Sequence, residues 1–99
     1  MGIVIGMDVG TTGAKALAID EKGAVVASAL VEYPLIAPKP GWAEQDPQDW
    51  EKASLEALSQ LSAGLGSRVQ DVKGLGLTGQ MHGSVFLDSK GEVLRNPIL

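Results

Sequence analysis

An aspartate stands directly before a turn rich in glycine and threonine in Met7-Asp8-Val9-Gly10-Thr11-Thr12-Gly13-Ala14-Lys15. The amides and hydroxyls of such a turn can donate hydrogen bonds to phosphate oxygens, and its glycines permit close backbone approach. The Asp8 carboxylate can hold Mg²⁺ directly or through water. The stretch therefore predicts a site for a metal-bound phosphate group, with Asp8 as metal ligand and five further contacts: Gly10, Thr11, Thr12, Gly13 and Lys15.

The same turn has a structural interpretation, in which its Asp and Gly residues serve only the geometry of a β-hairpin whose glycines can adopt positive φ. From the turn alone, this alternative stays open. A Walker-type loop is excluded, because Lys15 does not directly follow a glycine as G-x-x-x-x-G-K-[ST] requires. No helix is expected to begin at Ala14 either.

A second polar group, Gln80-Met81-His82, follows a segment with glycines at positions 74, 76 and 79. These glycines match G-x-G-x-x-G, but they lie within an expected strand, so close packing explains them better than dinucleotide binding. Gln80, Met81 and His82 then lie at the carboxyl end of that strand, where open α/β sheets form ligand crevices. His82 can exchange hydrogen bonds with sugar hydroxyls and Met81 offers an apolar wall, although a lone histidine is more often structural.

These groups require a sheet to position them, and the first third of the chain predicts three strands. The apolar run 3–7 predicts a central strand buried on both faces, and strands follow over 14–19 and 24–33, with a turn at 20–23. Short turns between consecutive strands favour antiparallel order. Prolines at 34, 38 and 40 then predict an extended connection rather than a helix.

A helix is predicted to begin at Asp46-Pro47, with the aspartate as N-cap, and to end near Gly64 and Gly66. Residues 72–78 predict a second central strand, parallel to an earlier one, and 84–87 with 92–94 predict a hairpin around the turn 88–91. The order βββαβ plus hairpin indicates an α/β domain with a mixed sheet. The expected apolar stripe of the helix consists of Trp50, Ala53, Ala57, Leu58 and Leu61.

Composition favours one folded domain and excludes several classes of function. Hydrophobic residues make up 44% and charged residues 20% of the 99 residues, as in globular proteins. The net charge of -4 and the absence of a basic cluster argue against nucleic-acid binding. Without cysteine, no disulfide or thiolate metal site forms. The chain shows no signal peptide and no apolar run of roughly 18 residues, so we expect no membrane span and a cytoplasmic location.

Three stretches together resemble the FGGY family of carbohydrate kinases: 7–15, Gly41-Trp42-Ala43-Glu44-Gln45-Asp46-Pro47 and Gly79-Gln80-Met81-His82-Gly83. Their order and spacing agree with the family over essentially the whole chain. The resemblance implies the ribonuclease H-like fold shared with actin, Hsp70 and hexokinase. The pair Met81-His82 is similar to members that phosphorylate D-xylulose, whereas glycerol kinases carry an Arg-Glu pair there.

The resemblance implies transfer of the ATP γ-phosphoryl group to a hydroxyl of D-xylulose, with Mg²⁺ neutralising charge. It implies that Gln80, Met81 and His82 contact the sugar, and that Asp8 lies near the Mg-nucleotide phosphates without being the base. Lys15 matches a position that is often arginine in relatives. In the family the base is an aspartate far downstream and adenine binds in a second domain. Residues 1–99 are therefore expected to be a partial N-terminal domain with negligible activity alone.

Two alternatives to this assignment remain. One is an FGGY kinase for another substrate, such as L-ribulose, L-fuculose, gluconate or glycerol. The other is a non-catalytic actin-like or Hsp70-like nucleotide-binding or interaction domain. A truncated domain should also expose apolar surfaces that normally pack on the missing part, which predicts a homodimer or a strand-exchanged oligomer for the isolated chain.

Overall fold

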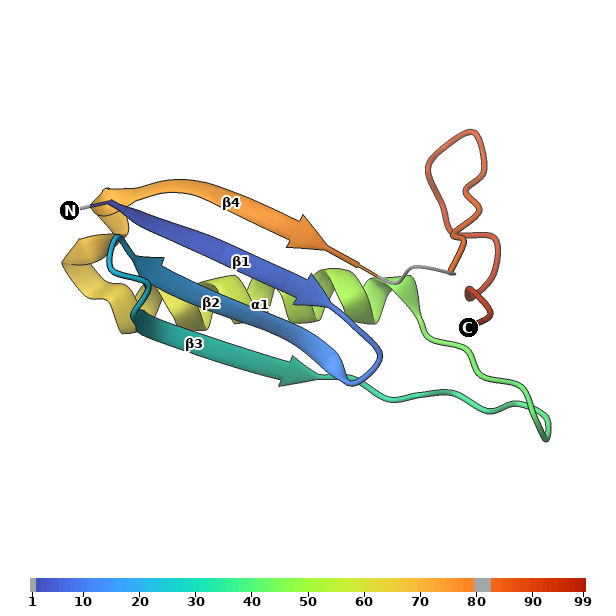
Figure 1. Cartoon of the computed structure of the whole chain (residues 1–99). Helices are drawn as coiled ribbons and strands as arrows, with labels where there is room; N and C mark the ends of the chain where they lie inside the picture. The colour runs from blue at the N-terminus through green and yellow to red at the C-terminus, as the bar shows by residue number, and fades with distance from the viewer. Residues whose placement is uncertain (1, 80–82) are drawn as a thin grey trace.

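The computed structural model describes residues 2–79 and 83–99, and its centre is a four-stranded mixed sheet (Figure 1). The strands β1 (Ile3–Val9), β2 (Gly13–Asp20) and β3 (Val25–Glu32) are antiparallel neighbours. They are followed by α1 (Pro47–Leu65), a 3-10 helix η1 (Gly66–Asp71), and β4 (Val72–Thr78), which lies parallel to β1. The sheet order is β3-β2-β1-β4, so the predicted βββαβ succession and mixed sheet are confirmed.

Helix α1 covers one face of the sheet, mainly over β2 and β3. The strand β2 turns three alanines toward it, Ala14, Ala16 and Ala18, and each is 0% exposed. Small side chains at these alternate positions let a helix approach the sheet closely. The buried residues of α1 recur at helical spacing and are Ala53, Ala57, Leu61 and Leu65. The predicted stripe is thus largely confirmed, with Trp50 and Leu58 only half-buried.

The start of α1 follows from its sequence as predicted. Asp46 is the N-cap and its Oδ1 accepts a hydrogen bond of 2.9 Å from the Gln48 amide, while Pro47 occupies the first helical position. Gly66 ends the helix with a φ of 59°. Among residues 2–79 and 83–99, no helix has the length and apolarity needed to cross a membrane.

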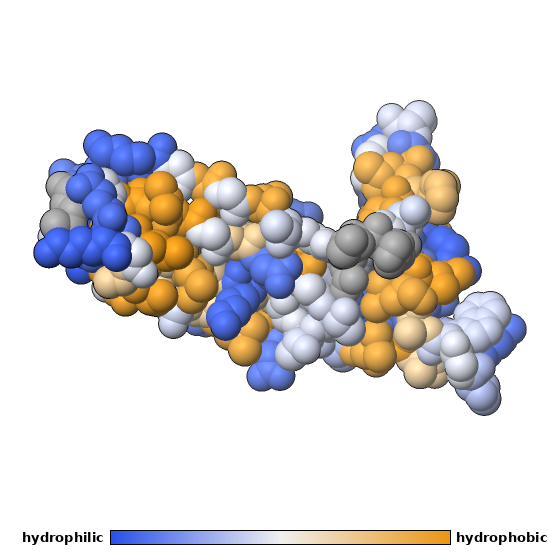
Figure 2. Space-filling view, in the orientation of Figure 1, coloured by the Kyte–Doolittle hydropathy of each residue, from blue (hydrophilic) through white to orange (hydrophobic). Residues whose placement is uncertain are grey.

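The opposite face of the sheet carries no covering element among the described residues, so the prediction that β1 is buried on both faces is wrong. Val4 is 52% exposed, and its register partner on β2, Ile19, lies on the same face. Farther along, Leu30 of β3 is 51% exposed beside Lys15. Figure 2 looks onto this face and shows apolar side chains gathered over the strands. We call this the open face.

Two further predictions, both about β4, are wrong. Strand β4 is an edge strand of the described sheet rather than a central one, because α1 leads the chain back to the outer side of β1. Leu75 and Leu77 pair with residues on the α1 side of β1, yet they are exposed because α1 lies over β2 and β3. A Cβ added at Gly74 or Gly76 would meet no atom of the described residues within 4 Å, so these strand glycines do not serve close packing here.

The predicted hairpin after β4 is reduced to a single antiparallel bridge between Leu87 and Val93. Its turn forms as expected: the Gly91 amide donates to the Asp88 carbonyl at 3.0 Å, and Gly91 has a φ of 81°. Asp88 also accepts amide hydrogen bonds from residues 90 and 92 through its side chain. The turn chemistry is therefore right, but the flanking segments lack a neighbouring strand among the described residues that would extend their pairing.

Candidate functional site

Asp8 stands near the carboxyl end of β1, between two polar partners on neighbouring strands. Its register partners are Lys15 on β2 and Thr78 on β4, so all three side chains lie on the open face. The Thr78 hydroxyl donates a hydrogen bond of 2.8 Å to Asp8 Oδ1. The parallel strands β1 and β4 end at the same edge of the sheet (Figure 1), the usual place for a ligand crevice in open α/β sheets.

These three residues border an open depression of about 510 Å³ on the sheet face. Its floor is low because Gly6 and Gly76, paired on β1 and β4, carry no side chains. Leu17 gives it an apolar wall. Thr78 was missed as a site residue by sequence reasoning, although its position at the end of a strand parallel to β1 was a usable signal.

The turn between β1 and β2 is narrow and closed by a hydrogen bond of 3.1 Å from the Gly10 amide to the Gly13 carbonyl. Neither Gly10 nor Gly13 has the positive φ that a glycine in a turn can adopt. Gly13 is required for another reason: a Cβ at this position would lie 2.4 Å from the Val31 carbonyl oxygen and 2.8 Å from Glu32 Cα. Strand β3 therefore approaches β2 closely at the point where the turn ends.

Three successive carbonyls of this turn are each held from outside it. The Tyr33 hydroxyl donates to the Gly10 carbonyl, Gln45 Nε2 donates to the Thr11 carbonyl at 2.6 Å, and the Tyr33 amide donates to the Thr12 carbonyl at 3.3 Å. In a trans peptide the C=O and the following N–H point in opposite directions. The N–H groups of these three peptide units therefore point away from the donors.

Tyr33 makes this turn sensitive to alkaline pH. Burial of the hydroxyl, and secondarily the negative charge of Asp8, raise the pKa of Tyr33 above its ordinary value of 10.0. A pKa that is higher in the folded state gives stability that is fully present below the unfolded pKa and is lost as pH rises through the folded one. Ionised Tyr33 also cannot donate to Gly10.

We therefore expect Tyr33→Phe to lower the free energy of unfolding by about 1 kcal/mol at pH 8, through loss of one hydrogen bond. The difference between variant and wild type should shrink above pH 10, where the wild type loses the same contact. Urea unfolding of both proteins at pH 8 and at pH 11 measures this. A difference that stays constant between the two pH values would contradict the assignment.

The residues expected to contact a sugar, Gln80, Met81 and His82, lie outside the described residues. The structure describes the segment that leads to them: β4 ends at Thr78, beside Asp8, and Gly79 follows. The sugar-contact prediction therefore remains a prediction.

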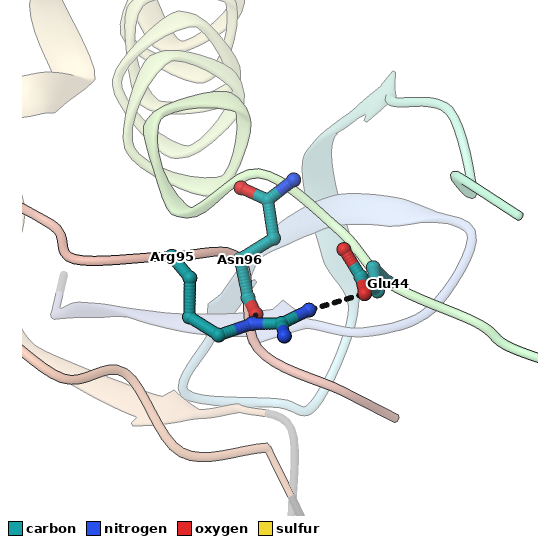
Figure 3. A network of polar contacts seen from close by, with 3 residues as sticks. All are labelled: Glu44, Arg95 and Asn96. Atoms are coloured by element: carbon teal, nitrogen blue, oxygen red, sulfur yellow. Dashed lines mark hydrogen bonds and ion pairs between the residues drawn. The ribbon is translucent and has the colours of Figure 1, made fainter. Parts of the chain in front are cut away.

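An ion pair that sequence reasoning missed joins the carboxyl-terminal segment to the 41–47 motif (Figure 3). Arg95 Nη2 binds Glu44 Oε2, and Arg95 Nε donates to the Asn96 carbonyl at 2.9 Å. Glu44 is 6% exposed, so its charge needs this partner. Isolated β-bridges from Glu44 to Ile98 and to Ile36 join the same two segments to each other and to the proline-rich connection.

The described residues fit a magnesium ion that is shared with a nucleotide, but not a cage made by the protein alone. They contain no group of three or more Asp, Glu, His or Cys side chains that could hold a metal. Mg²⁺ usually keeps several waters and binds through one or two carboxylates plus substrate phosphates. The exposed Asp8 carboxylate beside the turn is a side chain of this type.

Comparison with known proteins identifies the family to which this chain belongs. Residues 3–99 match the family model described as the FGGY family of carbohydrate kinases, N-terminal domain. The chain is 42% identical over 99 residues to the xylulose kinase of Bacillus subtilis, covering all of this chain and 20% of the relative. The chain belongs to the FGGY family of carbohydrate kinases.

Solved structures agree with this membership. A xylulose kinase from Brucella ovis superposes with a TM-score of 0.91 at 44% identity, over 98% of this chain and 20% of that one. A gluconate kinase from Lactobacillus acidophilus reaches 0.76 at 37% identity, over 98% of this chain and 19% of that one. The expected actin/hexokinase-like fold is thereby confirmed. The chain spans about one fifth of the length of these relatives.

Proposed function

We propose that residues 1–99 form the first part of the N-terminal domain of an ATP-dependent carbohydrate kinase and supply its phosphate-binding turn. The observation that carries this proposal is the position of Asp8, paired with Lys15 and Thr78 at the edge where β1 and β4 end. Family membership provides the reaction class: transfer of the ATP γ-phosphoryl group to a sugar hydroxyl.

In this proposal Asp8 binds Mg²⁺ directly or through water, and Mg²⁺ would neutralise charge on the nucleotide phosphates. Amides and hydroxyls of the turn donate to phosphate oxygens, and Lys15 adds a positive charge on the same face. The residue that accepts the proton of the sugar hydroxyl is assigned to the rest of the kinase. Asp8 is held by Thr78 at a strand end and suits metal and phosphate contacts instead.

We propose D-xylulose as the sugar, contacted by Gln80, Met81 and His82. Support comes from relatives named xylulose kinase at 42% and 44% identity. Gluconate is the second candidate, since a gluconate kinase is 37% identical over nearly the whole chain. A phosphoryl-transfer assay of the full-length protein with D-xylulose, gluconate, L-ribulose and glycerol separates these possibilities. D-xylulose should have the highest kcat/KM, and phosphorylation of another compound with D-xylulose untouched would refute the assignment.

The open face and the outer part of β4 also bear on the isolated chain. They expose apolar side chains, including Val4, Leu30, Leu75 and Leu77. These side chains lie on both faces of the sheet, and exposed apolar surface of this kind promotes association. We propose that the 99-residue chain alone forms oligomers, which light scattering across a hundredfold dilution should detect as a concentration-dependent mass. A monomer with one cooperative melting transition would contradict this.

A further inference from the structure

Gln45 is a fully buried polar side chain placed behind the phosphate-binding turn. It is 0% exposed, in a segment that runs between the proline-rich connection and α1. A buried amide destabilises a fold unless its polar atoms are hydrogen-bonded. Gln45 Nε2 donates to the Thr11 carbonyl at 2.6 Å, and Gln45 Oε1 accepts from Trp50 Nε1 at 3.0 Å.

Trp50 determines which way the Gln45 amide points. An indole N–H can only donate, so it fixes the oxygen of Gln45 on its own side and turns the NH₂ group toward Thr11. Trp50 is the fourth residue of α1, and the start of α1 is fixed by the Asp46 cap. A continuous set of contacts therefore runs from the helix start through Trp50 and Gln45 to the centre of the turn.

The bond to Thr11 is the central one of the three that hold the turn carbonyls, and Tyr33 makes the other two. Without it, the peptide unit between Thr11 and Thr12 could rotate and present its oxygen where its N–H now points. An oxygen facing a phosphate repels it, whereas an N–H binds it.

We infer that Gln45 is a positioning residue, held by Trp50, that keeps the Thr11–Thr12 peptide unit oriented for nucleotide phosphate. The inference rests on the proposed function, because it assigns a purpose to the same turn. The inference goes beyond the proposed function in one respect. It assigns the orientation of the turn to Gln45, a side chain that lies outside the turn and is not expected to touch the nucleotide.

Gln45→Glu is the most specific variant, because the carboxylate has the same shape as the amide. It can still accept the hydrogen bond from Trp50 but cannot donate one to the Thr11 carbonyl. Trp50→Phe removes the N–H that orients Gln45, together with part of the ring. The matched control is Gln60→Glu, the same chemical change on the exposed side of α1. The full-length protein is used throughout, with steady-state kinetics and amide hydrogen exchange of peptides covering residues 8–14.

For Gln45→Glu we expect the KM for Mg-ATP to rise about tenfold, the sugar KM to change less than about twofold, and exchange to quicken in residues 10–13. Trp50→Phe should act in the same direction but less strongly, and Gln60→Glu should match wild type. The inference is overturned if Gln45→Glu behaves like Gln60→Glu, or if both KM values rise together without faster exchange in the turn.

If wild type phosphorylates no sugar, the proposed function fails. Hydrogen exchange alone then decides: faster exchange at 10–13 in Gln45→Glu supports the positioning role and unchanged exchange refutes it.

Discussion

Asp8→Asn in the full-length kinase is expected to lower kcat by about a hundredfold to a thousandfold, with the protein still folded. The substitution keeps the size of the side chain and can keep a hydrogen bond to Thr78, but it removes the charge that would hold Mg²⁺ beside the phosphates. Raising the Mg²⁺ concentration should restore part of the activity, because a weakened metal site fills again at higher concentration.

The matched control for this variant is Asp71→Asn, since Asp71 lies in η1, just before β4, at the opposite end of that strand from Thr78. Steady-state assays across a range of Mg²⁺ concentrations, together with thermal unfolding, compare the two variants. An Asp8→Asn enzyme that keeps more than about a tenth of wild-type kcat would contradict a metal role for this carboxylate.

Gly13→Ala is expected to lower the free energy of unfolding by about 3 kcal/mol or to prevent folding. The added Cβ would lie 2.4 Å from a backbone oxygen of β3, and backbone cannot rotate away as a side chain can. Strand β3 would have to move off β2, which also disturbs the contact from the Tyr33 amide to the turn. Denaturant unfolding measures the loss.

Gly64→Ala provides the control, because Gly64 lies inside α1 and an added Cβ would meet only Ala27 Cβ, at an ordinary 3.6 Å. This change should raise the free energy of unfolding by about 0.5 to 1 kcal/mol, as alanine favours a helix over glycine. If both variants shift stability in the same direction and by similar amounts, the close approach at Gly13 is not what requires glycine there.

Local chemistry explains which elements were predictable from the sequence. Asp46 and Pro47 specify the helix start by their own hydrogen-bonding and φ preferences, so the prediction needed no knowledge of neighbours. The turn at Asp88 and Gly91 was predictable for the same reason. The strand boundaries of β1 and β2 moved only by a few residues from their expected positions.

Predictions of which elements pack against one another were less reliable, because an apolar run indicates burial without showing which element covers it. Strand β1 is apolar on both sides, yet α1 covers only one of them in the described chain. The role of Gly13 could not be predicted for a related reason. A glycine in a turn suggests positive φ, whereas here the missing side chain lets β3 approach β2 closely. Close approach between segments is a tertiary property.

Within the candidate site, the sequence located Asp8 and its turn but not the side chains that support them. Thr78, Tyr33 and Gln45 come from three distant segments, and only the sheet register and the path of the 34–46 connection bring them to the turn. The sugar contacts at 80–82 were inferred from likeness to a family. They are still predictions.

The central claim is that the turn after β1 binds the nucleotide phosphates with Asp8 at the metal. A crystal structure of the full-length protein with Mg²⁺ and a non-hydrolysable ATP analogue tests it most directly. We predict the terminal phosphates within hydrogen-bond distance of residues 10–13, with Mg²⁺ bound to Asp8 directly or through one water. A nucleotide whose phosphates and metal lie elsewhere, with the turn and Asp8 contacting neither, would contradict the account.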